Sequence, residues 1–417
     1  MLLYRASREA IPLFAVYALV FAEHGLSTSQ ISVLLAVWSA NAFLLEVPSG
    51  AWADVLDRRR LLIASGAVYA MAFATWVVWP GFLGFLLGFV LWSLSGAMLS
   101  GTYEAHLFDQ LTAAGRPLRY GPVKARAESL AVVVMAAAIA LAGPLHAAGG
   151  YALVGWLSVA TAALHTLLAL ALPRVATVTG IERAPRPEPS SVRAWGGSMR
   201  AGAREAAHHV AVRRVLLAYA TVVALVGFDE FSSLLLAEGG TPVPVIAWLL
   251  AGITLLQAAA TWAASAVARW AGLPHAGLVL AGGLLLALGA WAEGPLAFAG
   301  LAVGYALVTA AYISGDIRLQ HAISGVARAT TTSIGGLIGE VGFLVTLALI
   351  GLGTLRLDLG PVATVVALVL TPVAAVAAYR APAAPADRAD GPEASSAVDG
   401  GPGDAEGERP ATTGDPA

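Results

Sequence analysis

Long apolar runs, bounded by charged residues or by Gly and Pro, follow one another along most of the chain. Each is long enough for an α-helix to cross about 30 Å of hydrocarbon, although the first is short and must borrow residues from its flanks. None shows the ten-residue alternation of a membrane β-barrel. The pattern therefore predicts twelve membrane-spanning helices. The runs lie at residues 9–22, 29–52, 61–79, 82–108, 126–148, 151–172, 213–237, 243–268, 275–292, 295–317, 330–353 and 359–379.

The composition of the chain agrees with this pattern. Of the 417 residues, 58% are hydrophobic and 12% are charged, and the mean hydropathy is +0.76. A soluble domain carries about 25% charged residues, so a soluble enzyme, a nucleic-acid binder and a disordered chain are excluded. The chain has no cysteine, which excludes disulfides, thiolate metal sites and cysteine nucleophiles.

Basic residues indicate the orientation of the helices, because cytoplasmic loops of membrane proteins are enriched in Lys and Arg. If the N-terminus is cytoplasmic, Arg356 is the one residue among the 24 Lys and Arg that falls on the outer side. One helix more or fewer would scramble this partition. We therefore expect a multi-pass protein of the cell (plasma) membrane with both termini in the cytoplasm.

Two polar segments divide the chain. Residues 173–212 form the longest inner loop, which is rich in Arg and Pro, and we expect a cytoplasmic linker there. This linker separates an N-terminal six-helix bundle at 1–172 from a C-terminal six-helix bundle at 213–380. Residues 381–417 hold eight acidic residues and two arginines among Pro, Ala and Gly, which predicts a disordered acidic cytoplasmic tail.

The loop between the second and third runs carries a motif, Gly50-Ala51-Trp52-Ala53-Asp54-Val55-Leu56-Asp57-Arg58-Arg59-Arg60. It resembles the signature of the major facilitator superfamily, Gly-x-x-x-Asp-x-x-Gly-Arg-Arg/Lys, which lies in the same loop. Asp57 stands where glycine is usual, and the other signature positions match. With twelve spans divided six and six, the resemblance covers residues 1–380. It implies an all-α integral membrane protein with two six-helix bundles, the major facilitator fold.

Three further segments are similar to the drug-efflux-like branches of that superfamily. They are Glu46-Val47-Pro48-Ser49-Gly50, residues 100–109 at the end of the fourth span, and Arg328-Ala329-Thr330 at the start of the eleventh. Gly143-Pro144 in the fifth span is similar to part of the Gly-Pro signature of antiporters. The resemblance implies a secondary active transporter, and we expect proton-coupled efflux of small amphipathic molecules by alternating access.

The resemblance also implies a gate that closes the cytoplasmic side. Its residues are Gly50, Asp54, Arg58, Arg59, Asp109 and Arg328. Gly50 permits close helix packing, and Asp54 can cap a neighbouring helix, which the resemblance identifies as the eleventh span. Arg58 and Arg59 are expected to bridge to Asp109 at the inner end of the fourth span. The alternative is that these arginines only set the topology.

Carboxylates inside membrane spans are rare and functional by default. Glu46 lies eight residues before Asp54 and Glu340 twelve residues beyond Arg328, which places them about 12 Å and about 18 Å from the inner ends of their helices. Burial there favours the neutral carboxyl group, so each can take up a proton reversibly. We expect Glu46 and Glu340 to couple transport to protons; a structural, hydrogen-bonded glutamate is the alternative at each position.

Two adjacent acids, Asp229 and Glu230, lie in the outer part of the seventh span. The resemblance implies that spans one, four, seven and ten line the substrate cavity, so one acid can face it while the other points about 100° away. We expect one of the two to attract a cationic substrate, with a wetted acid as the alternative. Glu104 on the fourth span is a further cavity candidate, although pairing with an arginine is favoured.

The tryptophans at 38, 76, 79, 92, 156 and 291 are interpreted as bulk or interfacial anchors.

Other classes of function remain as alternatives. Uptake or facilitated transport of a sugar or other metabolite is the first. A polytopic membrane enzyme is remote, because the chain has no His-Glu-x-x-His, no paired aspartate-rich prenyl-diphosphate motif and no Gly-Lys-Ser/Thr phosphate loop. We expect no enzyme activity, no cofactor and no metal. The expected partners are a small-molecule substrate, protons and the lipid bilayer, with no nucleic acid and a monomeric state.

Overall fold

The computed structural model describes residues 1–174, 209–322 and 328–385. Within the helices, the side chains of residues 46–51, 53–55 and 328–334 lie outside the description. The predicted linker and acidic tail fall almost entirely on residues that are not described. The described residues form helices and short connections, with no β-strand among them. This confirms the all-α class that the apolar runs predicted.

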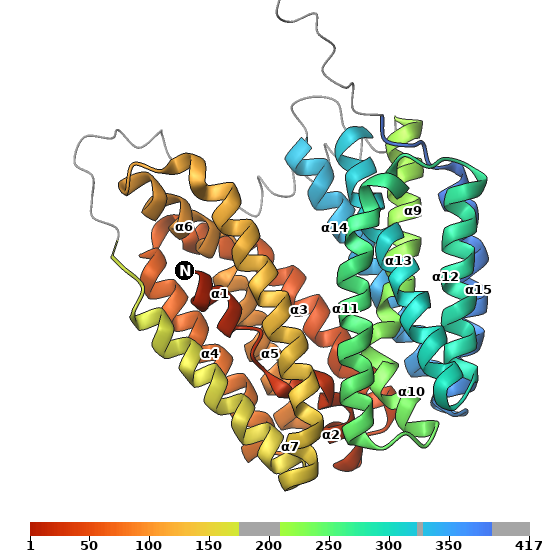
Figure 1. Ribbon diagram of the computed structural model, residues 1–417, viewed down its shortest axis with the longest axis horizontal. Helices are drawn as coiled ribbons and strands as arrows, with labels where there is room; N and C mark the ends of the chain where they lie inside the picture. Colours follow the sequence, from red (N-terminus) through yellow and green to blue (C-terminus); the bar gives the residue numbers. More distant parts are fainter. Residues whose placement is uncertain (175–208, 323–327, 386–417) are drawn as a thin grey trace, which may run out of the picture. The chain divides into compact units, whose positions relative to one another are not determined.

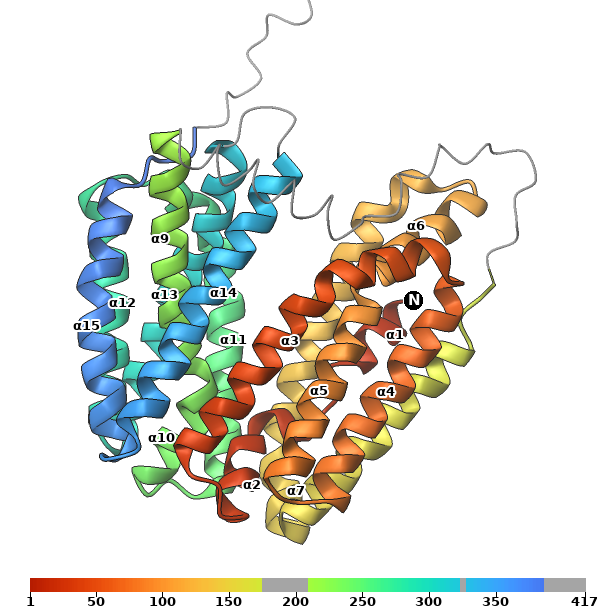
Figure 2. The ribbon, with the colours of Figure 1, turned by 180° about the vertical axis from the view of Figure 1, so that it is seen from behind.

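The first half of the chain forms the helices that Figures 1 and 2 show in red to yellow. They are α1 (Leu2–Ser7), η1 (Pro12–Ala15), α2 (Tyr17–Glu23), α3 (Thr28–Val55), α4 (Arg58–Val78), α5 (Phe82–Leu99), α6 (Thr102–Ala113), η2 (Pro117–Arg119) and α7 (Tyr120–Leu170). Helix α4 packs against α5 and α7, and α3 packs against α5. We call the elements from α1 to α7 the N half.

The first predicted span is broken into three pieces, α1, η1 and α2. Ile11 is extended and Pro12 opens the 3-10 turn, because proline restricts the preceding residue to extended conformations and has no N–H for a helix. The prediction of one continuous helix at 9–22 was therefore wrong. Instead, α1 and η1 pack against α7 within the N half.

Helix α7 contains the fifth and sixth predicted spans. Its backbone leaves the helical region at Gly149 and Gly150, and Gly150 has φ of +61°. Only glycine adopts such a conformation readily, so the two glycines turn the chain between two membrane passages. The predicted boundary between 148 and 151 is therefore confirmed.

The second half of the chain forms the helices shown in green to blue (Figures 1 and 2). They are α9 (Val210–Val226), η3 (Gly227–Phe231), α10 (Ser232–Glu238), α11 (Val243–Ala268), α12 (Leu273–Trp291), α13 (Gly294–Ala322), α14 (Arg328–Gly353) and α15 (Leu359–Arg380). Helix α12 packs against α13 and α15, and α11 packs against α13. We call the elements from α9 to α15 the C half. Across the two halves, α3 packs against α14 and α7 against α11, with smaller contacts of α10 with α2 and of α11 with η1.

Ten of the described segments are long and apolar enough to cross a membrane, and one of them, Pro117–Leu170, contains the turn at Gly149–Gly150. Counting its two passages separately and adding the broken first segment gives the twelve predicted spans. Large apolar side chains such as Trp262, Leu273 and Trp291 are exposed on helix surfaces. Such a surface is stable in lipid and not in water, so the protein is a multi-pass membrane protein.

The sidedness of the membrane helices stays a prediction, and two exposed loop leucines test it. Leu118, between the fourth and fifth spans, is 94% exposed, and Leu355, between the last two spans, is 67% exposed. We expect an impermeant thiol reagent added outside intact cells to label Leu355→Cys and not Leu118→Cys. The chain has no cysteine of its own, so each variant carries a single thiol. Labelling of Leu118→Cys in sealed cells would overturn the predicted orientation, and permeabilised cells serve as the control for reactivity.

Candidate functional site

The predicted gate motif lies at a tight connection between α3 and α4. Only Leu56 and Asp57 separate the two helices. The Asp57 side chain accepts a hydrogen bond of 2.8 Å from the Arg60 backbone N–H, which caps the N-terminus of α4. Aspartate at the usual glycine position is thus a helix cap.

The gate arginines have different partners. Arg58 forms an ion pair with Asp109 on α6, as expected. Arg59 does not reach Asp109: its side chain donates hydrogen bonds to the backbone carbonyls of Leu172, at 2.7 Å, and Leu170. Those carbonyls belong to the end of α7, where the last helical C=O groups lack partners in the helix. Arg59 therefore ties α4 to the end of the sixth span.

The side chains of the other gate residues lie outside the described part of the structure. Gly50 and Asp54 fall within α3 and Arg328 begins α14, but the surroundings of all three are outside the described residues. The same holds for the side chain of Glu46 on α3. The roles expected for these four residues stay predictions.

Glu340 on α14 faces the N half. Its carboxylate accepts a hydrogen bond from the Ser39 hydroxyl group on α3. Because α3 and α14 pack against each other across the two halves, this carboxylate lies at the interface between them. Its role in proton coupling stays a prediction.

Asp229 and Glu230 lie at an interruption of the seventh span. The α-helix gives way to the 3-10 turn η3 between α9 and α10, and both acids line one cavity of about 110 Å³. The expectation that one acid would point away was wrong, because the 100° spacing of a regular α-helix does not apply to this turn. The cavity combines residues of both halves: Phe14, Ala15, Tyr17, Ile139, Asp229, Glu230, Ser233, Leu250, Ile253 and Thr254.

Each acid of this pair has a neutral polar neighbour. The Tyr17 hydroxyl group of the N half donates to Glu230, and the Gln257 side chain on α11 lies near Asp229. No Lys, Arg or His among the described residues forms an ion pair with either acid. Asp229 is exposed although Phe228 and Phe231 beside it are buried, so its carboxylate borders open space.

An aromatic cluster of the N half adjoins this cavity. The Phe14 ring stacks on Trp92 with centroids 5.2 Å apart, and Trp92 lies 5.4 Å from Trp38 and 5.9 Å from Phe89. Trp38, Trp76 and Trp92 are therefore members of an interior cluster, and their bulk role holds rather than the interfacial one. The meeting of these rings beside the acid pair could not be predicted from the sequence, because they come from four separate helical elements.

Glu104 on α6 pairs with Lys124 on α7 at 3.6 Å, so the expected arginine partner was wrong. It lines a second cavity, of about 210 Å³, together with Arg5, Arg8, Glu9 and Glu128. We missed this group in the sequence, where Arg5 and Arg8 served only as markers of orientation. The signal that was available is the spacing Arg5-x-x-Arg8-Glu9, which is unusually charged for the start of a membrane span.

Contacts between the halves gather on the predicted outer side. The Ser29 and Thr354 hydroxyl groups lie 3.1 Å apart, close to the outer ends of α3 and α14. A Cβ atom at Gly351 would be 2.9 Å from that of Ser32, and one at Gly143 would be 2.4 Å from the Pro244 carbonyl oxygen. The backbones approach this closely because glycine has no side chain.

Among the described residues, no group of three or more His, Cys, Asp or Glu side chains is arranged to hold a metal ion. The residues that line the two cavities offer ionic pairing, hydrogen bonding and contact with aromatic rings.

The fold is similar to solved structures of transporters. A bacterial homolog of the human lysosomal transporter Spinster, in an inward-facing and unoccupied conformation, has 16% identity and a TM-score of 0.69, with 91% of this chain and 92% of that chain covered. The nucleoside transporter NupG has 13% identity and a TM-score of 0.69, with 91% and 96% covered. FucP, the E. coli fucose:proton symporter, in an outward conformation, has 15% identity and a TM-score of 0.54, with 91% and 97% covered.

These likenesses show the fold. FucP is described as a major facilitator superfamily transporter, and each of the three proteins is named as a transporter rather than an enzyme. The sequence matches no protein-family model and no curated protein. The chain thus has the major facilitator fold, as the motif and the twelve spans predicted.

The glycine contact at Gly143 supplies a test of closure on the outer side. In Gly143→Leu, the new side chain meets Pro244 and Trp248 on α11, so it should hold the halves apart. Ser233→Cys places a thiol on the wall of the cavity. We expect an impermeant thiol reagent added outside to label Ser233→Cys at least tenfold faster when Gly143→Leu is also present.

The matched control is Gly277→Leu, because a Cβ atom at Gly277 meets nothing within 4 Å. It should leave the labelling rate of Ser233→Cys unchanged. Equal labelling in the presence and absence of Gly143→Leu would show that this contact does not close the outer side.

Proposed function

We propose that the protein is a secondary active transporter that exports small amphipathic molecules in exchange for protons by alternating access. The observation that carries this proposal is the cavity between the halves, where Asp229 and Glu230 lie beside a cluster of aromatic rings. An amphipathic cation matches both features. Its charge pairs with a carboxylate, and its apolar part packs on the rings, whose faces also attract cations.

The missing counter-charge explains how such a site exchanges a substrate for protons. Two adjacent carboxylates in a low-dielectric cavity are costly unless something neutralises them. The described residues supply a hydroxyl and an amide but no cation. Either bound protons or a cationic substrate can supply the positive charge. Because both use the same oxygens, binding of one displaces the other, which is the requirement for antiport.

The position of the contacts between the halves supports a state that is open to the cytoplasm. The contacts Ser29–Thr354, Ser32–Gly351 and Gly143–Pro244 all lie on the predicted outer side. The Spinster homolog with a TM-score of 0.69 is inward-facing, in agreement with this interpretation. Export then starts with substrate entering from the cytoplasm and reaching the acid pair.

We further propose that the gate residues close the cytoplasmic side in the other state. The ion pair between Arg58 and Asp109 joins α4 to α6, and Arg59 joins α4 to the end of α7. These links hold the inner ends of α4, α6 and α7 together. We propose that Asp54 on α3 contacts the start of α14, at Arg328, and so joins the N half to the C half.

Uptake of a sugar or other metabolite is a second candidate that specific observations favour. Ser233 and Thr254 line the cavity beside the acids, and hydroxyl groups of this kind bind the hydroxyl groups of neutral polar solutes. The similar structures include a fucose:proton symporter and a nucleoside transporter. In this candidate the acids carry the proton alone.

Proteoliposomes with an imposed proton gradient distinguish the two candidates. We expect ethidium, a lipophilic aromatic cation, to dissipate the gradient in the presence of the protein, and fucose and uridine to have no effect. Asp229→Asn and Glu230→Gln should each lower the ethidium-dependent rate at least tenfold, which corresponds to about 1.4 kcal/mol. Dissipation by fucose or uridine and not by ethidium would establish the second candidate instead.

The control variant for this assay is Glu238→Gln at the outer end of α10. Glu238 accepts a hydrogen bond from the Gly360 backbone N–H and does not line the cavity. It should keep the rate of the unmodified protein, so that a general effect of removing a negative charge can be recognised.

Glu46 is a further carboxylate proposed to bind a coupled proton, in addition to the protons that substrate displaces from the acid pair. Glu46→Gln fixes the neutral form, so substrate should still bind while concentrative movement driven by a pH gradient is lost. Glu340→Gln should have a smaller effect, because Ser39 already supplies a hydrogen bond to that carboxylate. The measurement is ethidium accumulation in inside-out vesicles with and without a pH gradient. If Glu46→Gln accumulates ethidium at the original rate, the proton is carried elsewhere.

A further inference from the structure

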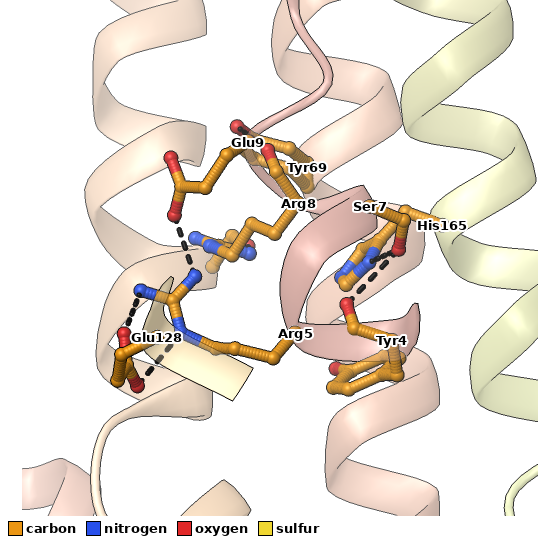
Figure 3. A network of polar contacts seen from close by, with 9 residues as sticks. Tyr4, Arg5, Ser7, Arg8, Glu9, Tyr69, Glu128 and His165 are labelled. Atoms are coloured by element: carbon orange, nitrogen blue, oxygen red, sulfur yellow. Dashed lines mark hydrogen bonds and ion pairs between the residues drawn. The ribbon is translucent and has the colours of Figure 1, made fainter. Parts of the chain in front are cut away.

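The N-terminal segment brings charged residues into the interior of the N half. Arg5 on α1 forms two hydrogen bonds with Glu128 on α7, Nε to Oε1 at 3.1 Å and Nη2 to Oε2 at 2.9 Å. Its Nη1 atom lies 2.6 Å from Oε1 of Glu9. Figure 3 shows the three side chains converging from α1, its following loop and α7. One arginine is therefore shared by two carboxylates.

Arg8 has no such carboxylate partner. It is 8% exposed, its Nη1 atom donates to the Ser95 hydroxyl group at 3.1 Å, and its guanidinium carbon lies 4.2 Å from the Tyr69 ring centroid. No ion pair to Arg8 is found among the described residues. A buried charge is normally paired, and a guanidinium group has five N–H donors. The positive charge of Arg8 is thus held by a hydroxyl group and a ring face alone.

The side chain of Arg8 borders a partly open cavity. The second cavity, of about 210 Å³, is lined by Arg5, Arg8 and Glu9 with Glu104 and Glu128. It forms where the fourth span is interrupted between α5 and α6, at Ser100 and Gly101. None of its lining residues belongs to the C half or to the cavity of the acid pair.

The charges around this cavity restrict the kind of ligand. Arg5 and Arg8 balance Glu9 and Glu128 in number, and Glu104 has Lys124 at 3.6 Å. An ion of one sign would leave an unbalanced charge in a low-dielectric bundle, which is costly. A zwitterion adds no net charge. Its anionic group can take the fork of Arg8, and its ammonium group can bind the carboxylates of Glu9 or Glu104.

We propose that this cavity binds a small zwitterionic group, an ammonium paired with a carboxylate or a phosphate, with Arg8 as the residue that holds the anionic end. This site goes beyond the proposed transport function, because its cavity shares no residue with that of the acid pair. Two sources offer this chemistry: a free solute of the amino-acid type and the head group of a zwitterionic phospholipid.

Binding to the purified full-length protein in maltoside detergent tests the proposal by calorimetry. L-Leucine has both charges, 4-methylpentanoate has only the carboxylate, and 3-methylbutylamine has only the ammonium group, on the same carbon skeleton. We expect the protein to bind L-leucine at least tenfold more tightly than either single ion. Glycerophosphoethanolamine is the second probe: binding of it and not of leucine assigns the site to a lipid head group, and binding of leucine assigns it to a free solute.

Two variants link the binding to this cavity. Arg8→Gln should lower the affinity for the preferred zwitterion at least tenfold. Glu104→Gln, at a less buried position, should lower it several-fold and decides the question if Arg8→Gln does not fold. Arg116→Gln is the matched control, because Arg116 is an exposed basic residue beyond α6 that does not line the cavity.

The proposal is overturned if neither zwitterion binds, if a single ion binds as tightly, or if folded Arg8→Gln and Glu104→Gln keep the full affinity. The ethidium assay in proteoliposomes reports on the acid pair separately. Ethidium-driven proton movement without zwitterion binding would leave the proposed function intact and remove this inference. Zwitterion binding without any transport would remove the proposed function and leave a binding site.

Discussion

The costs of leaving backbone groups unpaired in hydrocarbon determine where this chain can interrupt its helices. Irregular backbone at membrane depth is stable only where protein covers it or where it lines a cavity. The interruptions near Pro12, at Ser100–Gly101 and at 227–231 occur in the first, fourth and seventh spans. Each of them contributes residues to one of the two cavities. The helices are thus interrupted where the irregular backbone can line a cavity.

The same constraint explains two arginines that form no ion pair among the described residues. Arg59 donates to the carbonyls at the end of α7. In the C half, Arg318 on α13 is 2% exposed and donates to the carbonyls of Val267, at 3.0 Å, Trp270 and Pro382. Free carbonyls at helix C-termini carry partial negative charge, so a guanidinium group satisfies them and stabilises the ends. Both arginines join the inner ends of neighbouring spans.

The twelve spans, the turn at Gly149–Gly150 and the fold could be predicted from the sequence because they depend on runs of apolar residues and on glycine. The site was predicted only in part. Asp229 and Glu230 were identified because acids in apolar runs are conspicuous, yet their shared cavity depends on a 3-10 turn that has no clear sequence signal. Arg8 was missed because a basic residue near a span end is ordinarily a marker of orientation. Its burial follows from the fold of α1 against α7, a tertiary contact.

The two cavities differ in the charge that the protein leaves without a partner. At the acid pair, two carboxylates have neutral polar neighbours and no cation; at Arg8, a guanidinium group has a hydroxyl and a ring and no anion. In a low-dielectric interior such imbalances raise the free energy of the empty site more than that of a site filled by a complementary group. Each site therefore favours a ligand that places a complementary charged group beside the unpartnered one, and at Arg8 the ligand must also carry a positive group because the surrounding charges balance in number. Tyr17 of the N half donates a hydrogen bond to Glu230 of the C half. Neutralising the acid pair therefore changes a hydrogen bond that joins the two halves. Binding of substrate or protons must alter such a contact if it is to make the halves move.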